Sequence, residues 1–358
     1  MGLVASLAYK PAMHSEYANP LQDADWNKRI LHYETANIFH SAQWARVLAE
    51  SYGYSPQYAI FTELNGTVGI LPIMEVQSVW TGRRGVCLPF SDECVPLLSG
   101  TVTLESALES VRALGLQRQW DYFELRGFGE PGPLAVQTDQ FLTHNLLLEQ
   151  NEERQQHQLR DSTRRNIRRA LKEGVEVEHL QSLDAVDAFY ALHSRTRRRH
   201  GLPPQPLRFF HLIHKHLIEP GLGMISLARY SGRWIAGAVF LHFGSRAVYK
   251  FGASDPEFQR VRANNLLMWQ AIRQLHGKGI AQLSFGRSDR DDAGLLQFKR
   301  GWGARETELP YYRIGLRKSI QSSSRHKGTT GRLRQQFVQR LPLSFLRLAG
   351  GLMYKHLG

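Results

Sequence analysis

The same order of predicted elements occurs twice in this chain of 358 residues, once in each half. Alternating apolar residues predict strands, and apolar residues three or four positions apart predict helices. In the first half these patterns predict a hairpin, a helix and a strand, at 57–61, 68–76, 104–114 and 121–125. In the second half they predict a hairpin, a further strand, a helix and a last strand, at 224–229, 234–243, 247–251, 264–276 and 282–285. Two α+β domains with mixed central sheets account for this order.

Turn residues and polar stretches mark the ends of these elements. Asn65-Gly66 is a strong two-residue hairpin turn, and Ser231-Gly232 takes the same place in the second half. The polar stretch 149–157 separates the halves and leads into a predicted helix at 159–173. We therefore expect domains at 1–150 and 151–315, the second closed by a strand at 309–314, followed by a basic tail at 316–358.

Most of the excess positive charge lies near the C-terminus. The formal net charge is +13, and no acidic residue follows Glu308. The basic residues beyond that point are Arg313, Arg317, Lys318, Arg325, Lys327, Arg332, Arg334, Arg340, Arg347 and Lys355. The composition of 322–331 predicts a linker, and 332–357 alternates apolar and basic residues as an amphipathic helix broken at Pro342 does. Such a tail favours an anionic partner, namely membrane lipid, RNA or a phosphorylated substrate; a solvated tail without a partner is the alternative.

Other features argue against several classes of protein. Cys87 and Cys94 are too few for a disulfide framework and lack the further ligands of a zinc site, which predicts two reduced thiols. Only two of His211, His214 and His216 would share a helical face, so we expect no metal site. No apolar run is long enough to cross a membrane, and no signal peptide is recognisable. We expect a cytoplasmic protein, with peripheral attachment to the inner face of the membrane if the tail binds lipid.

Two polar segments in the second half could carry chemistry. In the first, Asp255 follows a predicted strand, and Arg260 and Arg262 precede a helix that starts near Asn264. A helix N-terminus offers free N–H groups to an anion, and the arginines would reinforce it. The alternative is a structural helix start that is capped by Asn264.

The second segment is SFGRSDRDDAGLLQFKRGWGA, residues 284–304. A polar loop from Arg287 to Asp292 ends at Asp292, which can cap a short helix at 294–300. Phe298 and Lys299 lie side by side near the end of this helix. By position alone, Lys299 is a surface residue that suits the helix dipole.

These segments resemble the FemAB-like proteins, a branch of the GNAT superfamily that includes the aminoacyl-tRNA-dependent transferases that form peptidoglycan bridges. The resemblance spans most of residues 39–312. It rests on FHSAQWARVLAESYGYSP from Phe39, GRRGVCLPFSDECVPL from Gly82, STRRNIRRALKEGV from Ser162, FYALHSRTRRRHGLPPQP from Phe189, IAGAVFLHFGSRAVYKFGASDPEFQRVRANNLLMWQAI from Ile235 and FGRSDRDDAGLLQFKRGWGA from Phe285.

The resemblance implies two tandem GNAT-like domains with the substrate cleft between them. It also implies transfer of an acyl group from an activated donor to an amine of a cell-envelope precursor. In the aminoacyl-tRNA-dependent relatives a Phe-Lys pair serves the donor. Carried over, Phe298 would stack near the donor nucleotide, and Lys299 would stabilise the anionic oxygen of the tetrahedral intermediate.

The chain departs from its relatives in two ways. It lacks the heptads of the long coiled-coil arm that the bridge-forming transferases usually insert. The CoA-binding turn Q/R-x-x-G-x-G/A is also altered, because Arg262 and Asn264 replace glycines that allow close backbone approach. This does not favour ordinary CoA binding. We expect the donor to be aminoacyl-tRNA, or acyl-CoA held in a different way. We expect no tightly bound cofactor.

An amine nucleophile must lose a proton, so carboxylates near the cleft are candidate bases. Asp92, in the first domain, could face the cleft, and Asp255, Asp289 and Asp291 lie in the second. Each could instead serve a turn or a cap. Tyr249 could orient the substrate or pack in the core. Arg287 and Asp289 complete the expected donor and substrate site.

Basic clusters recur at helical spacing, at Arg160, Arg164, Arg165, Arg168 and Arg169, and again at Arg195, Arg197, Arg198 and Arg199. They fit a phosphate-rich partner, such as a nucleotide-sugar, a lipid pyrophosphate or a tRNA acceptor end, or else a solvated face. Three functions stay open: an envelope N-acyltransferase of FemAB type, an acyl-CoA-dependent transferase in exopolysaccharide synthesis, and a non-catalytic RNA- or lipid-binding module.

Overall fold

A single long sheet runs through both halves of the protein in this computed structural model, which describes residues 14–63, 66–100, 102–127, 129–320 and 329–358. Its eleven strands follow the order β10-β11-β12-β13-β14-β9-β15-β8-β6-β5-β2. In that order they are Glu176–Leu180, Gly223–Tyr230, Arg233–Phe243, Arg246–Ser254, Gln282–Ser288, Ala135–Leu147, Arg305–Gly315, Tyr122–Arg126, Gly82–Val86, Met74–Ser78 and Ser55–Pro56. A second sheet has the order β1-β3-β4-β7, at His14–Ala18, Tyr58–Glu63, Gly66–Leu71 and Leu97–Leu98.

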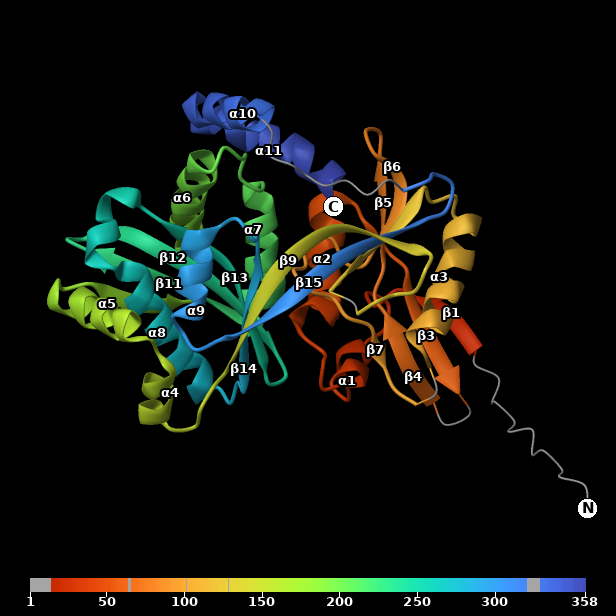
Figure 1. Cartoon of the computed structure of the whole chain (residues 1–358), viewed down its shortest axis with the longest axis horizontal. Coiled ribbons are helices and arrows are strands. Elements are labelled where there is room, and N and C mark those ends of the chain that lie inside the picture. Colours follow the sequence, from red (N-terminus) through yellow and green to blue (C-terminus); the bar gives the residue numbers. More distant parts are fainter. Residues whose placement is uncertain (1–13, 64–65, 101, 128, 321–328) are drawn as a thin grey trace, which may run out of the picture.

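Strands β9 and β15 connect the halves. They pair with each other along most of their length, β9 also pairs with β14, and β15 also pairs with β8. Both therefore cross diagonally from one half to the other (Figure 1). As a result, Tyr311 near the end of β15 reaches a loop of the first half, although it comes late in the sequence.

Helices cover both faces of the sheet in the second half. Helices α5 (Asp161–Lys172) and α8 (Ala263–Gly277) bury apolar residues with one face, and α6 (Leu183–Arg199) and α7 (Leu207–Ile213) with the other. In the first half, α2 (Ala42–Tyr52) is capped by Ser41, whose hydroxyl accepts from the Trp44 amide at 3.1 Å. The other helices of the two halves are α1 (Trp26–Ile30), η1 (Ile38–His40), α3 (Leu104–Gln117), α4 (Glu152–Gln158), η2 (His214–Ile218), η3 (Pro256–Val261) and α9 (Ala293–Arg300).

The α+β class with mixed sheets is confirmed, and so are most of the predicted elements. The predicted return strand at 68–76 is wrong, because β4 ends at Leu71 and β5 begins at Met74 in the other sheet. Pro72 lies between them, where it cannot donate a ladder hydrogen bond. The hairpin itself is confirmed by the antiparallel pairing of β3 and β4, although Asn65 lies outside the described residues.

The tail forms two helices, α10 (Thr329–Arg340) and α11 (Leu343–Leu357), with the predicted break at Pro342. Residues 321–328, most of the expected linker, lie outside the described part of the chain. Helix α11 packs on the body: the Tyr354 hydroxyl accepts from Arg197 at 2.8 Å, and the Tyr54 hydroxyl donates to the Tyr354 carbonyl at 3.1 Å. Among the described residues, no helix combines the length and apolarity needed to cross a bilayer.

Candidate functional site

A buried cluster of charged side chains lies where the two halves meet. From the first half comes Asp92, in the loop that follows β6, and from the second come Lys250 of β13 and Lys299 of α9. The Asp92 carboxylate accepts from the Lys250 ammonium, with 3.0 Å between Oδ2 and Nζ. The Asp92 side chain is 21% exposed and that of Lys250 only 5%. The ion pair is therefore largely desolvated, which strengthens its electrostatic attraction.

A β-bulge directs Lys250 toward Asp92. In the pairing of β12 with β13, Val239 lies opposite Phe251 and Phe240 opposite Tyr249, so Lys250 is the extra residue. Its ammonium lies 5.1 Å from the ring centre of Phe39, within cation–π range. Burial lowers the pKa of Lys250, while the Asp92 carboxylate opposes this shift.

Lys299 is a core residue and not a surface one. Asp292 caps α9 by accepting from the Leu295 amide at 3.0 Å, and this fixes the rotation of the helix. Lys299 is only 1% exposed, and its Nζ donates to the carbonyls of Gly286 at 2.8 Å and Arg287 at 3.3 Å. Burial lowers its pKa to about 8, against the opposing charge of Asp92. An ammonium has three N–H donors, and two of those of Lys299 are used in these bonds. The third has no acceptor among the residues that the structure describes.

Gly286 brings the charged groups close together. It ends the regular part of β14 with a left-handed φ of +64°, and a Cβ at this position would lie 2.9 Å from Oδ2 of Asp92. A side chain here would therefore meet both strain and the carboxylate. Because Lys299 binds the Gly286 carbonyl, the glycine links Asp92 on one side to Lys299 on the other.

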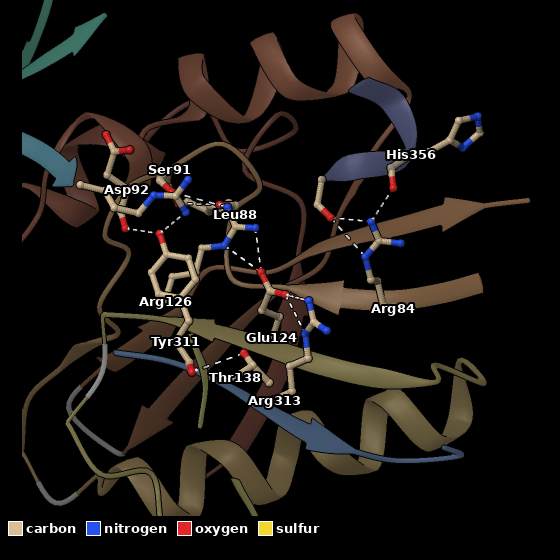
Figure 2. A network of polar contacts seen from close by, with 12 residues as sticks. Arg84, Leu88, Ser91, Asp92, Glu124, Arg126, Thr138, Tyr311, Arg313 and His356 are labelled. Carbon is tan, nitrogen blue, oxygen red and sulfur yellow. Dashed lines mark hydrogen bonds and ion pairs between the residues drawn. The ribbon is translucent and has the colours of Figure 1, made fainter. Parts of the chain in front are cut away.

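An ion network holds the Asp92 loop in place (Figure 2). Arg126 of β8 donates to the Leu88 carbonyl at 3.3 Å and to Glu124 at 2.7 Å. Glu124 is bound on its other oxygen by Arg313 at 2.8 Å. Burial alone would raise the pKa of Glu124, but the two arginines lower it to about 2. The Tyr311 hydroxyl completes the network by donating to the Asp92 carbonyl at 2.7 Å.

The loop carries backbone strain that this network offsets. Leu88 and Phe90 have φ values of 50° and 58°, in the left-handed region that is costly for residues with a side chain. Such strain costs about 1–3 kcal/mol per residue and persists only where surrounding contacts hold it. The neighbouring Cys87 and Cys94 are free, buried thiols, in agreement with the sequence prediction.

A cavity of about 190 Å³ adjoins this loop, between η1 and strands β13 and β14. Asp92 and Glu93 line it, together with Phe39, Arg246 and Ser284. Burial raises the pKa of Glu93, so this carboxyl takes up a proton more readily than an exposed one. Sequence reasoning missed both Glu93 and Lys250. The only local signal was a lysine inside the apolar strand AVYKFGA, where an unpaired charge would be costly.

Other predicted catalytic residues lie in structural positions. Asp255 caps η3, because its carboxylate accepts from the Glu257 amide at 3.1 Å, and it lies 3.7 Å from Arg195. Tyr249 packs against Phe240, with 5.4 Å between ring centres, and burial raises its pKa to about 12. These contacts agree with the alternatives of a helix cap for Asp255 and core packing for Tyr249.

The predicted donor residues lie at different places around the cluster. Arg287 is exposed at the edge of the cluster: its guanidinium is 4.3 Å from the ring centre of Phe141 and donates to the Tyr311 hydroxyl at 3.3 Å. Phe298 is half-buried and packs against Trp302, with 5.9 Å between ring centres. Asp289 is exposed in the loop before α9, as is Asp291.

The start of α8 differs from the expected cap. Arg262 occupies the N-cap with a φ of 60°, and no side chain caps the helix, so Asn264 does not act as the cap. Arg260, Arg262 and Asn264 are all exposed there. The first N–H groups of α8 therefore point to a surface that carries two arginines.

The histidines at 211–216 have separate partners. His211 contacts Asp187 at 2.9 Å, and His216 contacts Glu50 at 3.0 Å. Asp187 belongs to α6 and Glu50 to α2, so both acids come from other helices. His214 contacts a backbone carbonyl instead. No group of three or more His, Cys, Asp or Glu suited to a metal ion occurs in the described part of the chain.

Part of the chain is similar in sequence to known proteins. Residues 157–300 match the model of the acetyltransferase (GNAT) domain. A segment of 78 residues is 30% identical to lipid II:glycine glycyltransferase of Staphylococcus aureus, and covers 20% of this chain and 18% of that protein. The match thus spans less than a fifth of the curated relative.

Solved structures show the same architecture. FemX superposes with a TM-score of 0.67 at 14% identity, covering 85% of this chain and 98% of the other. A tandem GNAT protein from the clavulanic acid biosynthesis pathway gives a TM-score of 0.56 at 10% identity, covering 86% and 100%. At these identities the likeness establishes the fold, two tandem GNAT units, and not the substrate.

Proposed function

The chain contains a GNAT acyltransferase domain within a FemX-like fold, and we propose that it transfers an acyl or aminoacyl group to an amine of a cell-envelope precursor. The observation that carries the proposal is the buried ammonium of Lys299, which retains one donor beside Asp92 at the junction of the halves. Burying a charge is costly, and a module that only binds RNA or lipid would gain nothing from that cost.

The reaction begins when the free amine attacks the carbonyl carbon of the activated donor. A C–N bond forms, and the carbonyl oxygen becomes an oxyanion that the remaining N–H of Lys299 stabilises. The intermediate then collapses, the C–O bond of an aminoacyl ester or the C–S bond of a thioester breaks, and the leaving group takes a proton. The nitrogen gives up its extra proton to a base.

Two neighbouring carboxylates divide the work on the amine. Asp92 already pairs with one ammonium, that of Lys250, and its position suits it to orient the acceptor amine. Glu93 lines the same cavity, and burial raises its pKa, so its carboxylate binds a proton more readily than an exposed one and is suited to act as the base. Lys250 then holds Asp92 in position, because its ammonium donates to the Asp92 carboxylate.

The donor is aminoacyl-tRNA or acyl-CoA, and both carry phosphate. The uncapped start of α8, with Arg260, Arg262 and Asn264, supports phosphate binding there. Phe298 offers a partly exposed ring for stacking, and Arg287 and Asp289 would position the acyl end. The side chains that replace the CoA-binding glycines favour aminoacyl-tRNA over a tightly held CoA. No resident cofactor is needed for either donor.

The acceptor is proposed to be a phosphorylated or lipid-linked precursor. The Staphylococcus aureus relative is by its name a lipid II:glycine glycyltransferase, which supports an acceptor of this kind. Exposed arginines of α5, such as Arg165 and Arg168, could contact its phosphates. A lipid-linked acceptor lies at the inner face of the cytoplasmic membrane, so attachment of the basic tail to that surface belongs to the same proposal.

The test is a transfer assay with two donor panels, aminoacyl-tRNAs and acyl-CoAs, and amine acceptors of the envelope pathway. We expect one donor class to support transfer by the wild-type chain. An acyl-CoA that raises the Tm of the purified protein would favour the CoA-dependent alternative in exopolysaccharide synthesis. Absence of transfer from both panels would contradict the proposal.

A further inference from the structure

Helix α11 is apolar on two opposite faces. Leu346, Gly350 and Tyr354 are buried against the body of the protein. On the other side Phe345, Leu348 and Leu352 are 54%, 65% and 57% exposed, at the spacing of one helical stripe. A surface helix of a globular protein usually turns polar residues outward. The outward stripe of α11 therefore lacks the usual polar cover.

The apolar surface continues onto the turn between β5 and β6. Val79 and Trp80 at this turn are 89% and 61% exposed. The Trp80 ring lies 4.2 Å from the ring of His356 near the end of α11, and Nδ1 of His356 is 3.0 Å from the Ser78 hydroxyl. The turn and the helix are thus fixed to each other, and they lie along one edge of the molecule together with α10 (Figure 1).

The same edge is positively charged. Arg340 and Lys355 are exposed on α10 and α11, and neither helix contains an acidic residue. Arg347 is exposed as well, but its guanidinium lies 5.0 Å from the ring centre of Tyr190 on α6. We define Val79, Trp80, Phe345, Leu348 and Leu352, with Arg340 and Lys355, as the docking face.

We propose that the docking face inserts shallowly into an anionic lipid bilayer. Apolar side chains bordered by basic ones, with an interfacial tryptophan, are the combination that binds such a surface, because burial and electrostatic attraction add. This inference deepens the proposed function, since it specifies the surface by which the enzyme would reach a lipid-linked acceptor. The inference adds the β5–β6 turn to the membrane-binding surface. The charge of the tail alone does not indicate that this turn takes part.

The proposal is tested by flotation of the full chain with vesicles of phosphatidylglycerol and phosphatidylcholine. We expect the wild type to float with them, and to bind pure phosphatidylcholine vesicles at least tenfold more weakly. The double variant Leu348→Asp/Leu352→Asp and the variant Trp80→Ser should each lower the partition coefficient at least tenfold. Leu134→Asp and Leu171→Asp are matched controls, because these leucines are also exposed, at 62% and 55%, but lie elsewhere.

Several outcomes would overturn the inference. They are a wild type that does not float, docking-face variants that float like the controls, and a wild-type dimer that the Leu348→Asp/Leu352→Asp change dissociates without vesicles. The last result would assign the face to a second copy of the chain. Circular dichroism and Tm verify that each variant is folded. Flotation needs no acyl transfer, so an inactive chain that floats refutes only the proposed transfer reaction. An active chain that does not float refutes this inference and the membrane attachment of the tail, but not the transfer reaction.

Discussion

Asp92 and Lys250, which are 158 residues apart in the sequence, form an ion pair of 3.0 Å between the two halves of the chain. Neither partner is fully exposed, and the Lys250 ammonium is surrounded by Phe39, Trp44 and Phe251. The ion pair therefore joins the two halves and holds the negatively charged Asp92 carboxylate beside Lys299.

Asp92→Asn should lower the free energy of unfolding by about 3 kcal/mol, because it leaves the Lys250 ammonium buried without its counter-charge. Adding Lys250→Met should restore most of that stability, since no unpaired charge then remains. Transfer should stay impaired in the double variant, because the Asp92 carboxylate is still missing. Urea unfolding and initial rates measure the two effects separately. Full recovery of the rate would limit Asp92 to a structural role.

The pH dependence of transfer should show a fall in rate as the pH rises through about 8. The pKa of Lys299 is about 8, and only the protonated form carries the charge that stabilises an oxyanion. Lys299→Arg should weaken this alkaline fall, because a guanidinium stays protonated. An alkaline limb that persists unchanged in this variant would assign it to another group.

A second limb is expected at acidic pH, where Glu93 becomes protonated and can no longer accept a proton. Burial raises its pKa above the ordinary value of 4.5, so the rate should begin to fall at a higher pH than for an exposed carboxylate. Glu93→Gln should lower kcat by about 10²–10⁴ and remove this limb. Glu109→Gln, at an exposed position, is the control. An unchanged acidic limb in Glu93→Gln would exclude it as the base.

The neutral ring of His40 should make the fold sensitive to acid. Its nitrogens contact the Val95 carbonyl at 2.8 Å and Asn37, and burial lowers its pKa from 6.5 to about 4. The unfolded chain takes up this proton below pH 6.5 and the folded chain does not, so the contribution is complete above pH 6.5. It is lost as the pH falls toward 4, at about 1.4 kcal/mol per pH unit. His40→Gln should flatten the dependence in denaturant titrations at pH 7 and 5; an unchanged slope would contradict this.

The sequence predicted the elements that are determined by residues close together in the chain. The hairpins, α8 and the Asp292 cap of α9 depend on neighbouring residues, and the structure confirms them. Strand β9 escaped prediction because AVQTDQFLTHNLL mixes polar and apolar residues without strict alternation. It crosses between the halves, so its environment changes along its length.

The site was less predictable, because it depends on contacts between distant segments. The meeting of Asp92 with Lys250 requires a bulge and the crossing of β15, and neither has a local signal. Lys299 stood out only through the family resemblance, since a lysine near a helix end is ordinarily a surface residue. Its burial follows from the way α9 packs against the end of β14.

The role of Lys299 is tested most directly by single-turnover transfer with the donor that supports activity, comparing the wild type with Lys299→Met and with the exposed control Lys278→Met. Lys299→Met should fold with a Tm no lower than the wild type, because the change removes a buried charge. It should nevertheless transfer roughly a hundredfold to a thousandfold more slowly, while Lys278→Met matches the wild type. Transfer by Lys299→Met at the wild-type rate would contradict the account.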